Sequence, residues 1–266
     1  MTARSSLPQT GPSDGLRGRE APDPAGPALP GITDQRDYWE SWNAAARDPD
    51  ALNPWCERRA DVMLGYLRGL ELSSPSILDL GCGTGWFSAR LARYGRVTGV
   101  DLAESVIARA QARGTGVRFV AGDIFTMQLP RNHFDVVASQ EVIAHVPDQA
   151  AYLDRAADAL KPSGHLIITT PNKFVVERGD FFPPQPPGHI EHWLSIRRMR
   201  SLLSDRFRIV RWTTIIPMGD RGILRIVNSS GLHSGLSAFM GARRVQAVKE
   251  RIGLGYIMVI LARKRI

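Results

Sequence analysis

The chain has 266 residues, a length that suits one α/β domain with appendages. Hydrophobic residues make up 43% of it, which excludes a disordered chain, and no run approaches the ~18 apolar residues of a membrane span. The formal net charge is +8, and residues 191–266 hold 15 of the 34 basic side chains but only four of the 26 acidic ones.

The chain has two cysteines, Cys56 and Cys82, which are too few for a disulfide framework and show no CxxC spacing for zinc. The first residues lack the continuous apolar segment of a signal peptide, because Ser5, Ser6 and Pro8 interrupt it. We therefore expect a protein of the reducing cytoplasm.

Two helices are expected ahead of the main domain. Residues 1–30 are rich in Pro, Gly and Ser, a composition typical of a disordered tail. Residues 34–47 and 55–70 then follow helical patterns. We interpret residues 31–72 as an N-terminal helical lid and residues 73–266 as the main domain.

From residue 76 onward, apolar strands alternate with helices. The expected strands are residues 76–80, 96–100, 117–121, 134–139 and 165–170. The expected helices between them are residues 86–94, 103–113 and 148–160, the last with Asp148 as its N-cap and with Pro162 and Gly164 at its end. Such alternation predicts a parallel sheet covered by helices on both faces.

The pattern changes after residue 170. The expected order is a Pro-rich loop (171–190), a helix (195–204), a strand (208–216), an insert (217–254) with one helix (242–251) and a last strand (255–262). The basic charge gathers here, and a solvated basic face is the plainest interpretation. More specific interpretations are that the basic charge binds an acidic substrate, an anionic membrane surface or nucleic acid, although no RNA-binding signature supports the last.

The insert also mixes apolar side chains with arginine over residues 221–252. One hypothesis is that it contacts an anionic membrane surface or a lipid-like substrate. The alternative is an ordinary lid over a substrate pocket.

A glycine-rich turn follows the first strand in the segment ILDLGCGTGWFSARLA, residues 77–92. Its three glycines permit a tight strand-to-helix turn and the close approach of a ligand to the backbone. A dinucleotide fingerprint would need a third glycine where Trp86 stands, and no Gly-Lys-Ser/Thr follows, so the turn is not a phosphate-binding P-loop. Asp101 ends the next strand, where a carboxylate can accept hydrogen bonds from ribose hydroxyls.

The pattern of Asp79, Gly81, Gly83 and Gly85 resembles motif I of the class I S-adenosylmethionine (SAM)-dependent methyltransferases. Further segments match in order, namely AGDIF (121–125), FDVVASQEVIAHVPD (134–148) and LKPSGHLIITTPN (160–172). SQEVIAHVPD and GHIEHWLSIRRMRSLL look most like the UbiG-like small-molecule O-methyltransferases. The resemblance spans roughly residues 55–212 and departs at SDRF (204–207) and in the insert.

The resemblance implies a Rossmann-like doubly wound fold, with a mostly parallel seven-stranded sheet whose last strand is antiparallel. It implies SAM as the cofactor, with Asp123 at the adenine amino group, the Ile124 backbone beside it and Gln140 in contact through its backbone. The full set of cofactor-binding candidates is Asp79, Gly81, Cys82, Gly83, Gly85, Asp101, Leu102, Asp123, Ile124, Gln140 and Arg58. Cys82 is also a plausible packing residue, and Arg59 next to Arg58 leaves the register of that arginine open.

Methyl transfer to a hydroxyl group benefits from a base, and four residues are candidates. His145 has a suitable unperturbed pKa and follows Glu141 by four residues, so a helix would place both on one face. His189 and His192 lie in a loop after the fifth strand, where substrate pockets are often built. Packing or surface roles remain open for all four, and a metal site is not expected because no further ligand set accompanies them.

The aromatic residues Tyr38, Trp39 and Trp42 on the first helix could exclude water from the cofactor, or simply pack. The leading hypothesis is O-methylation of a small phenolic, hydroxylated or carboxylated metabolite. N- or C-methylation and a SAM-binding protein without catalysis stay open. A nucleic-acid substrate is not expected, because residues 139–142 read SQEV instead of an Asn/Asp-Pro-Pro-Tyr motif.

Overall fold

The computed structural model describes residues 29–46, 53–179 and 189–266. The expected disordered tail lies almost entirely outside the described residues. Two helices open the described chain, α1 (Ile32–Ala46) and α2 (Pro54–Arg68). No described helix is both long enough and apolar enough to cross a bilayer.

Seven strands form one sheet in the order β3-β2-β1-β4-β5-β7-β6. The strands are β1 (Ser76–Leu80), β2 (Arg96–Asp101), β3 (Arg118–Ala121), β4 (Phe134–Gln140), β5 (Leu160–Pro171), β6 (Phe207–Pro217) and β7 (Gly255–Lys264). The first five pair in parallel, whereas β7 runs antiparallel to both β5 and β6. The expected fold class is therefore confirmed.

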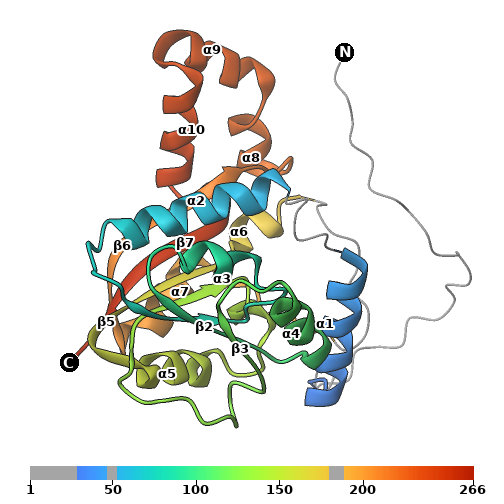
Figure 1. Cartoon of the computed structure of the whole chain (residues 1–266). Helices are drawn as coiled ribbons and strands as arrows, with labels where there is room; N and C mark the ends of the chain where they lie inside the picture. The colour runs from blue at the N-terminus through green and yellow to red at the C-terminus, as the bar shows by residue number, and fades with distance from the viewer. Residues whose placement is uncertain (1–28, 47–52, 180–188) are drawn as a thin grey trace, which may run out of the picture.

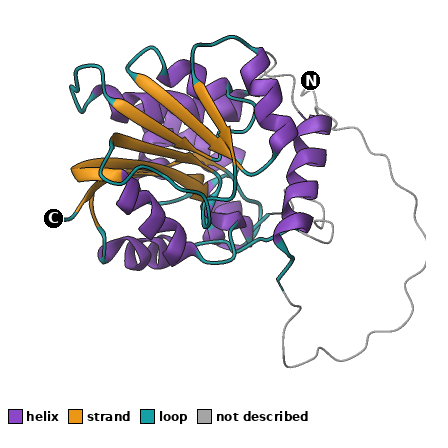
Figure 2. Cartoon of the chain, turned by 60° about the horizontal axis from the view of Figure 1, so that its bottom comes forward, coloured by secondary structure: helices purple, strands orange, loops and turns teal. Residues whose placement is uncertain are grey.

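Helices cover both faces of the sheet (Figures 1 and 2). They are α3 (Trp86–Leu91), α4 (Glu104–Ala112), α5 (Gln149–Ala159), α6 (Lys173–Val176) and α7 (Ile196–Ser204), besides α2, whereas α1 packs beside α4. Because side chains alternate along a strand, Ile77 packs in the layer with α2 while Leu78 packs in the layer with α5. The central strands are buried on both faces, as their apolar runs predict.

The predicted helix 148–160 begins as expected, since the Asp148 side chain accepts a hydrogen bond from the Ala151 N–H over 2.9 Å. Its end agrees with the prediction to one residue, but Pro162 and Gly164 do not form the stop. The helix stops at Ala159, and Pro162 and Gly164 lie within β5, because Leu160 already pairs with Phe134 across an irregular start of that strand.

The insert between β6 and β7 differs most from expectation. It contains three helices instead of one, α8 (Gly222–Val227), α9 (Ser230–Met240) and α10 (Ala242–Arg251). Together residues 221–252 form a projection, called the arm below, which stands away from the sheet in Figure 1. The helix α9 lacks the charged face of an ordinary surface helix, which is why the periodic pattern missed it.

Candidate active site

The glycine turn lies between β1 and α3 at the carboxyl edge of the sheet. Gly81, Gly83 and Gly85 all have positive φ angles, of 71°, 53° and 76°. A Cβ on Gly81 would lie 2.2 Å from the Val142 side chain, so glycine is required there for space as well as for conformation. The turn is tied to β2, since the N–H groups of Gly81 and Cys82 donate to the Val100 carbonyl.

Asp101 faces this turn from the end of β2. Its Oδ2 accepts from the Gly83 N–H over 2.8 Å, and its Oδ1 accepts from the Ala103 N–H over 3.1 Å. Burial raises the pKa of the Asp101 carboxyl, while these backbone donors act in the opposite direction. Each carboxylate oxygen keeps a further lone pair, so the group can also accept from a ribose diol. This donor and acceptor set fits the nucleoside part of SAM, with the half-buried Leu102 beside it.

Two other predicted cofactor residues lie behind the turn. Asp79 is 1% exposed and its Oδ2 accepts from the Ser88 hydroxyl over 2.6 Å. Burial raises the pKa of Asp79 to about 7. Cys82 packs in a small cluster with Phe119 of β3, and burial raises the pKa of its thiol. Both residues therefore brace the glycine turn from within.

Asp123 and Ile124 follow β3 at the same edge. The Asp123 Oδ1 accepts from the Phe125 N–H over 2.9 Å and so stabilises its own turn. The Ile124 carbonyl accepts from the Arg155 guanidinium over 2.8 Å. Both are half-buried, and with Asp101 they form a row along the ends of β2 and β3.

The structure separates the two adjacent arginines of α2. Arg58 is 44% exposed in its side chain and pairs with Glu250 of α10 over 2.9 Å. Arg59 is buried and donates to the Gln140 side chain over 2.8 Å at the end of β4. Of the two, Arg59 lies at the sheet edge. The sequence offered no signal to choose between them, because both fit the helical pattern.

Glu141 adopts a left-handed conformation with φ of 59° just after β4. Its carboxylate accepts from the Thr169 hydroxyl over 2.7 Å and lies 3.8 Å from the Arg59 guanidinium. The short 3-10 helix (Ile143–His145) begins only after Glu141. Glu141 and His145 therefore do not lie on one face of a regular helix, which corrects the expectation from the sequence. Glu141, which follows β4, thus contacts β5 and α2. His145 instead contacts aromatic and imidazole rings.

His145 belongs to an aromatic–imidazole cluster, here called the imidazole cluster, made of Tyr38, Trp39, His145, His189 and Trp193. The two imidazole rings stack with centroids 4.7 Å apart. Trp39 lies edge-on to both, at 5.1 Å from His145 and 5.5 Å from His189. Tyr38 stacks on His189 at 4.3 Å, and Trp193 lies edge-on to His145 at 5.7 Å.

Hydrogen bonding orients the His145 ring. Its Nδ1 lies 2.9 Å from the Ile190 carbonyl, which can only accept, so Nδ1 carries the proton and donates. A neutral His145 thus keeps its lone pair on Nε2. Burial lowers the pKa of His145 to about 4, and burial together with His145 lowers the pKa of His189 to about 4. Both rings are neutral near pH 7.

His189 is the more unusual of the pair, because its side chain is 4% exposed and neither ring nitrogen has a hydrogen-bond partner in the described structure. Its Nδ1 lies 3.4 Å from the Glu191 carboxylate, an electrostatic contact without hydrogen-bond geometry. A buried polar group without a partner costs free energy, which a hydroxylated ligand could recover. His192 is exposed and does not join the cluster. Among the described residues no three metal-binding side chains gather.

The helix α1 lies over both parts of the site. Its Asn43 carbonyl accepts from the Arg109 guanidinium of α4 over 2.8 Å. A Cβ on Gly83 would meet the Asn43 side chain at 3.7 Å, so the C-terminal half of α1 covers the glycine turn. Tyr38 and Trp39 in its N-terminal half cover the two imidazoles. Trp42, stacked on Tyr38, is 40% exposed at the outer side.

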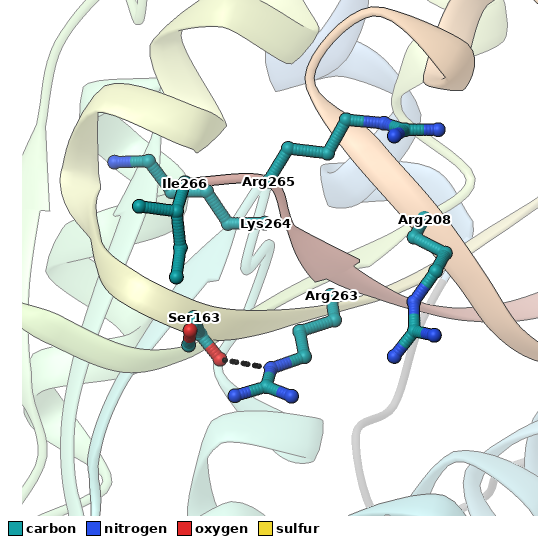
Figure 3. A pocket seen from close by; sticks show the side chains of 6 residues that line it. All are labelled: Ser163, Arg208, Arg263, Lys264, Arg265 and Ile266. Carbon is teal, nitrogen blue, oxygen red and sulfur yellow. Dashed lines mark hydrogen bonds between the residues drawn. The ribbon is translucent and has the colours of Figure 1, made fainter.

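A surface hollow elsewhere does not belong to this site. It is lined by Ser163, Arg208, Arg263, Lys264, Arg265 and Ile266 (Figure 3). These residues lie at the start of β6, at and just beyond the end of β7 and, for Ser163, near the start of β5, where His165 pairs with Arg263. The hollow is therefore at the opposite edge of the sheet from the glycine turn.

Comparison with known proteins matches residues 78–168 to the family described as Methyltransferase domain. A ubiquinone biosynthesis O-methyltransferase of Xylella fastidiosa (strain 9a5c) is 39% identical over 131 residues, which cover 46% of this chain and 50% of that protein. The protein of the same name from Coxiella burnetii (strain RSA 331 / Henzerling II) is 33% identical over 185 residues, covering 65% and 73%. The chain thus spans half the length of the first relative and almost three quarters of the second.

Among solved structures, a 1,6-didemethyltoxoflavin-N1-methyltransferase of Burkholderia thailandensis with bound 1,6-didemethyltoxoflavin and S-adenosylhomocysteine has a TM-score of 0.60. Its sequence is 21% identical, and the match covers 92% of this chain and 95% of that one. At this identity the likeness shows a shared fold and carries no assignment of the acceptor.

Proposed function

This chain belongs to the SAM-dependent methyltransferases, and on that premise we propose that it transfers a methyl group to an oxygen of a small-molecule metabolite. The glycine turn with Asp101 binds the cofactor, and the imidazole cluster binds the acceptor. The observation that carries the proposal is the His145 ring, which is oriented through Nδ1 beneath Trp39 in the segment that follows β4, the strand beside β1.

When bound, SAM would supply an electrophilic methyl group on its sulfonium, with the neutral thioether of S-adenosylhomocysteine as the leaving group. The chain's own residues then have two tasks, alignment and removal of a proton. Asp101 and the backbone of the glycine turn hold the nucleoside part, and this fixed placement can supply much of the rate. No residue of the chain needs to form a covalent bond.

His145 acts as the general base through Nε2. A neutral imidazole with a pKa near 4 is a weak base toward a free phenol, but an oxyanion forming beside it raises that pKa. The Ile190 carbonyl stabilises the resulting imidazolium by accepting from Nδ1. His189, whose ring stacks on that of His145, forms a second hydrogen bond with the substrate that receives the methyl group.

The walls of the imidazole cluster favour a flat aromatic acceptor. Tyr38, Trp39 and Trp193 offer ring faces and edges to a planar ligand, and such contacts exceed simple area burial in strength. A phenolic substrate satisfies both these walls and the unpartnered His189. The helix α1, which covers both the imidazole cluster and the glycine turn, serves in this proposal as the lid that keeps water from the reacting groups.

The test is transfer of an isotope-labelled methyl group from SAM to a panel of phenols, aliphatic alcohols, carboxylic acids, amines and carbon acids. The proposal expects a methyl ether from at least one phenol, with one equivalent of S-adenosylhomocysteine per product and the position assigned by NMR. Products formed only from amines or carbon acids would replace the O-methylation proposal. Tight SAM binding with no transfer to any acceptor would contradict catalysis.

A further inference from the structure

The arm is not needed to complete the fold. The strands that it connects, β6 and β7, are antiparallel neighbours, and Pro217 at the end of β6 pairs directly with Gly255 at the start of β7. A hairpin loop of a few residues would join them. The chain instead inserts three helices that stand beyond α2, away from the rest of the molecule (Figure 1).

The base of the arm is fixed firmly to the domain. Leu224 of α8 and Val245 of α10 are buried. The Thr214 hydroxyl of β6 donates to the Glu250 carbonyl over 2.6 Å, and Arg58 of α2 pairs with the Glu250 carboxylate. These contacts hold the arm in one place and leave α9 as its outer part.

The outer part of the arm presents apolar side chains to solvent. On α9, Leu232, Leu236 and Phe239 follow one helical stripe and are 40%, 38% and 90% exposed. Exposed apolar side chains also occur on or beside the other two helices, namely Ile223, Ile226, Val248 and Ile252. The arm holds half of all the large hydrophobic side chains that are exposed in the described chain. A concentration of this kind marks a surface that something covers.

All the charged side chains that the arm exposes are positive. Its exposed charged side chains are all arginines, namely Arg221, Arg225, Arg243, Arg244 and Arg251. The one acidic residue within it, Glu250, is buried and paired with Arg58. The nearest exposed acid, Asp220, lies just before the arm, at its base. The arm therefore combines exposed apolar side chains with a surface charge that is positive throughout.

We infer that the arm is a docking surface for an anionic lipid bilayer. Amphipathic helices at a membrane interface insert apolar side chains such as Leu and Phe between headgroups, while arginines contact the anionic phosphates. A second copy of this chain fits poorly, because a two-fold contact would bring the same arginines against each other. The α9 sequence contains no charged residue and two glycines, so this short helix gains stability when a medium covers its apolar stripe.

Co-sedimentation of the full chain with vesicles tests the inference. The probes are phosphatidylcholine vesicles and vesicles in which a third of the lipid is phosphatidylserine. We expect binding to the anionic vesicles only, weakening as salt is raised. The variants Leu236→Ser with Phe239→Ser, and Arg243→Glu with Arg244→Glu, should each lower the vesicle affinity about tenfold or more.

Matched control variants change residues of β6 and β7 that lie toward the end of these two strands opposite to the arm. Arg208→Glu with Arg263→Glu reverses two exposed arginines in the basic hollow of Figure 3, and Val210→Ser removes an exposed apolar side chain from β6. Both should leave vesicle binding unchanged. Because all substituted side chains are exposed, circular dichroism should report an intact fold in each variant.

Equal binding to neutral and anionic vesicles, no binding at all, or an equal loss in the control variants would overturn the inference. Self-association of the wild type that Phe239→Ser abolishes, without vesicle binding, would assign the surface to a second copy. Capture of an acidic protein in place of vesicles would likewise overturn it. None of these outcomes depends on the methyl-transfer reaction.

Discussion

The glycine turn and the imidazole cluster both lie beneath α1, yet they are held together in different ways. The turn is fixed by backbone N–H groups and the carboxylate of Asp101, all within one short stretch from β1 to the start of α4. The cluster brings together α1, the segment after β4 and the loop before α7, which contact one another mainly through rings. The first part is rigid and local, whereas the second depends on the tertiary fold and on the position of α1.

Because of this difference, we expect the glycine turn and the imidazole cluster to control different quantities. Substitutions in the cluster should affect chemistry and leave cofactor affinity unchanged, whereas substitutions around the turn should affect folding or cofactor affinity. The following four predictions test that separation from the largest expected effect to the smallest.

Replacing His145 removes the proposed base. His145→Gln should lower kcat about 10²–10⁴-fold, because it removes the nitrogen that takes the proton, while the affinity for S-adenosylhomocysteine stays within about twofold. Steady-state kinetics and titration calorimetry measure the two quantities. His133→Gln, an exposed histidine outside the site, is the matched control and should change neither. A His145 variant with wild-type kcat would remove the base from the account.

Gly85→Ala tests the rigidity of the turn. Gly85 has φ of 76°, and an added Cβ would lie 2.5 Å from the Phe119 ring. Left-handed backbone and overpacking together should lower the free energy of unfolding by about 2–4 kcal/mol, measured by urea denaturation. Gly114→Ala shares the positive φ, of 62°, but meets nothing within 4 Å, so it should cost only about 1 kcal/mol. Equal costs at the two positions would show that the turn is not tightly packed.

Asp101→Asn tests the cofactor contact itself. The amide replaces one acceptor oxygen with a donor that faces a backbone N–H, so affinity for S-adenosylhomocysteine should fall about tenfold to hundredfold. Calorimetric titration measures it. Asp61→Asn, on the exposed side of α2, should leave the affinity unchanged. An Asp101 variant that binds normally would place the cofactor elsewhere.

The pH dependence of stability tests the imidazole cluster. In the folded protein the pKa values of His145 and His189 are about 4, against 6.5 for a free imidazole. Between pH 6.5 and 4 the unfolded chain therefore binds more protons, and the free energy of unfolding falls as the pH falls. Asp79 acts in the opposite sense, because its raised pKa makes the folded state bind the extra proton.

His189→Gln should show a shallower loss of stability across this window than the wild type. Denaturant midpoints measured at several pH values give both slopes, and the unchanged contribution of Asp79 cancels in their difference. Parallel slopes for His189→Gln and the wild type would mean that the buried imidazole is not what titrates.

The same contrast explains how much could be predicted from the sequence. The strand, the three glycines and Asp101 could be placed because their contacts fall within a short stretch with characteristic spacing. The stacking of His145 on His189 could not, because it joins residues far apart in the chain through side-chain contacts alone. For the same reason Arg59 could not be told apart from Arg58, and Trp193 was missed.

The helices of the arm could be predicted from the sequence only in part. Its last helix was predicted at residues 242–251, but α8 and α9 were not. Serine and glycine dominate the polar positions of α9, and these residues favour turns over helices. The spacing of Leu232, Leu236 and Phe239 was the available signal, and it predicts a helix only if the glycines between them are discounted.

Single-turnover transfer of a labelled methyl group, with SAM at saturating concentration and a phenol from the panel, tests the central claim most directly. The account predicts that Asp101→Asn recovers near wild-type transfer once the cofactor saturates, whereas His145→Gln stays slow at every concentration of SAM. The reverse pattern, or wild-type transfer in the His145 variant, would contradict the assignment of cofactor and acceptor to these two parts of the site.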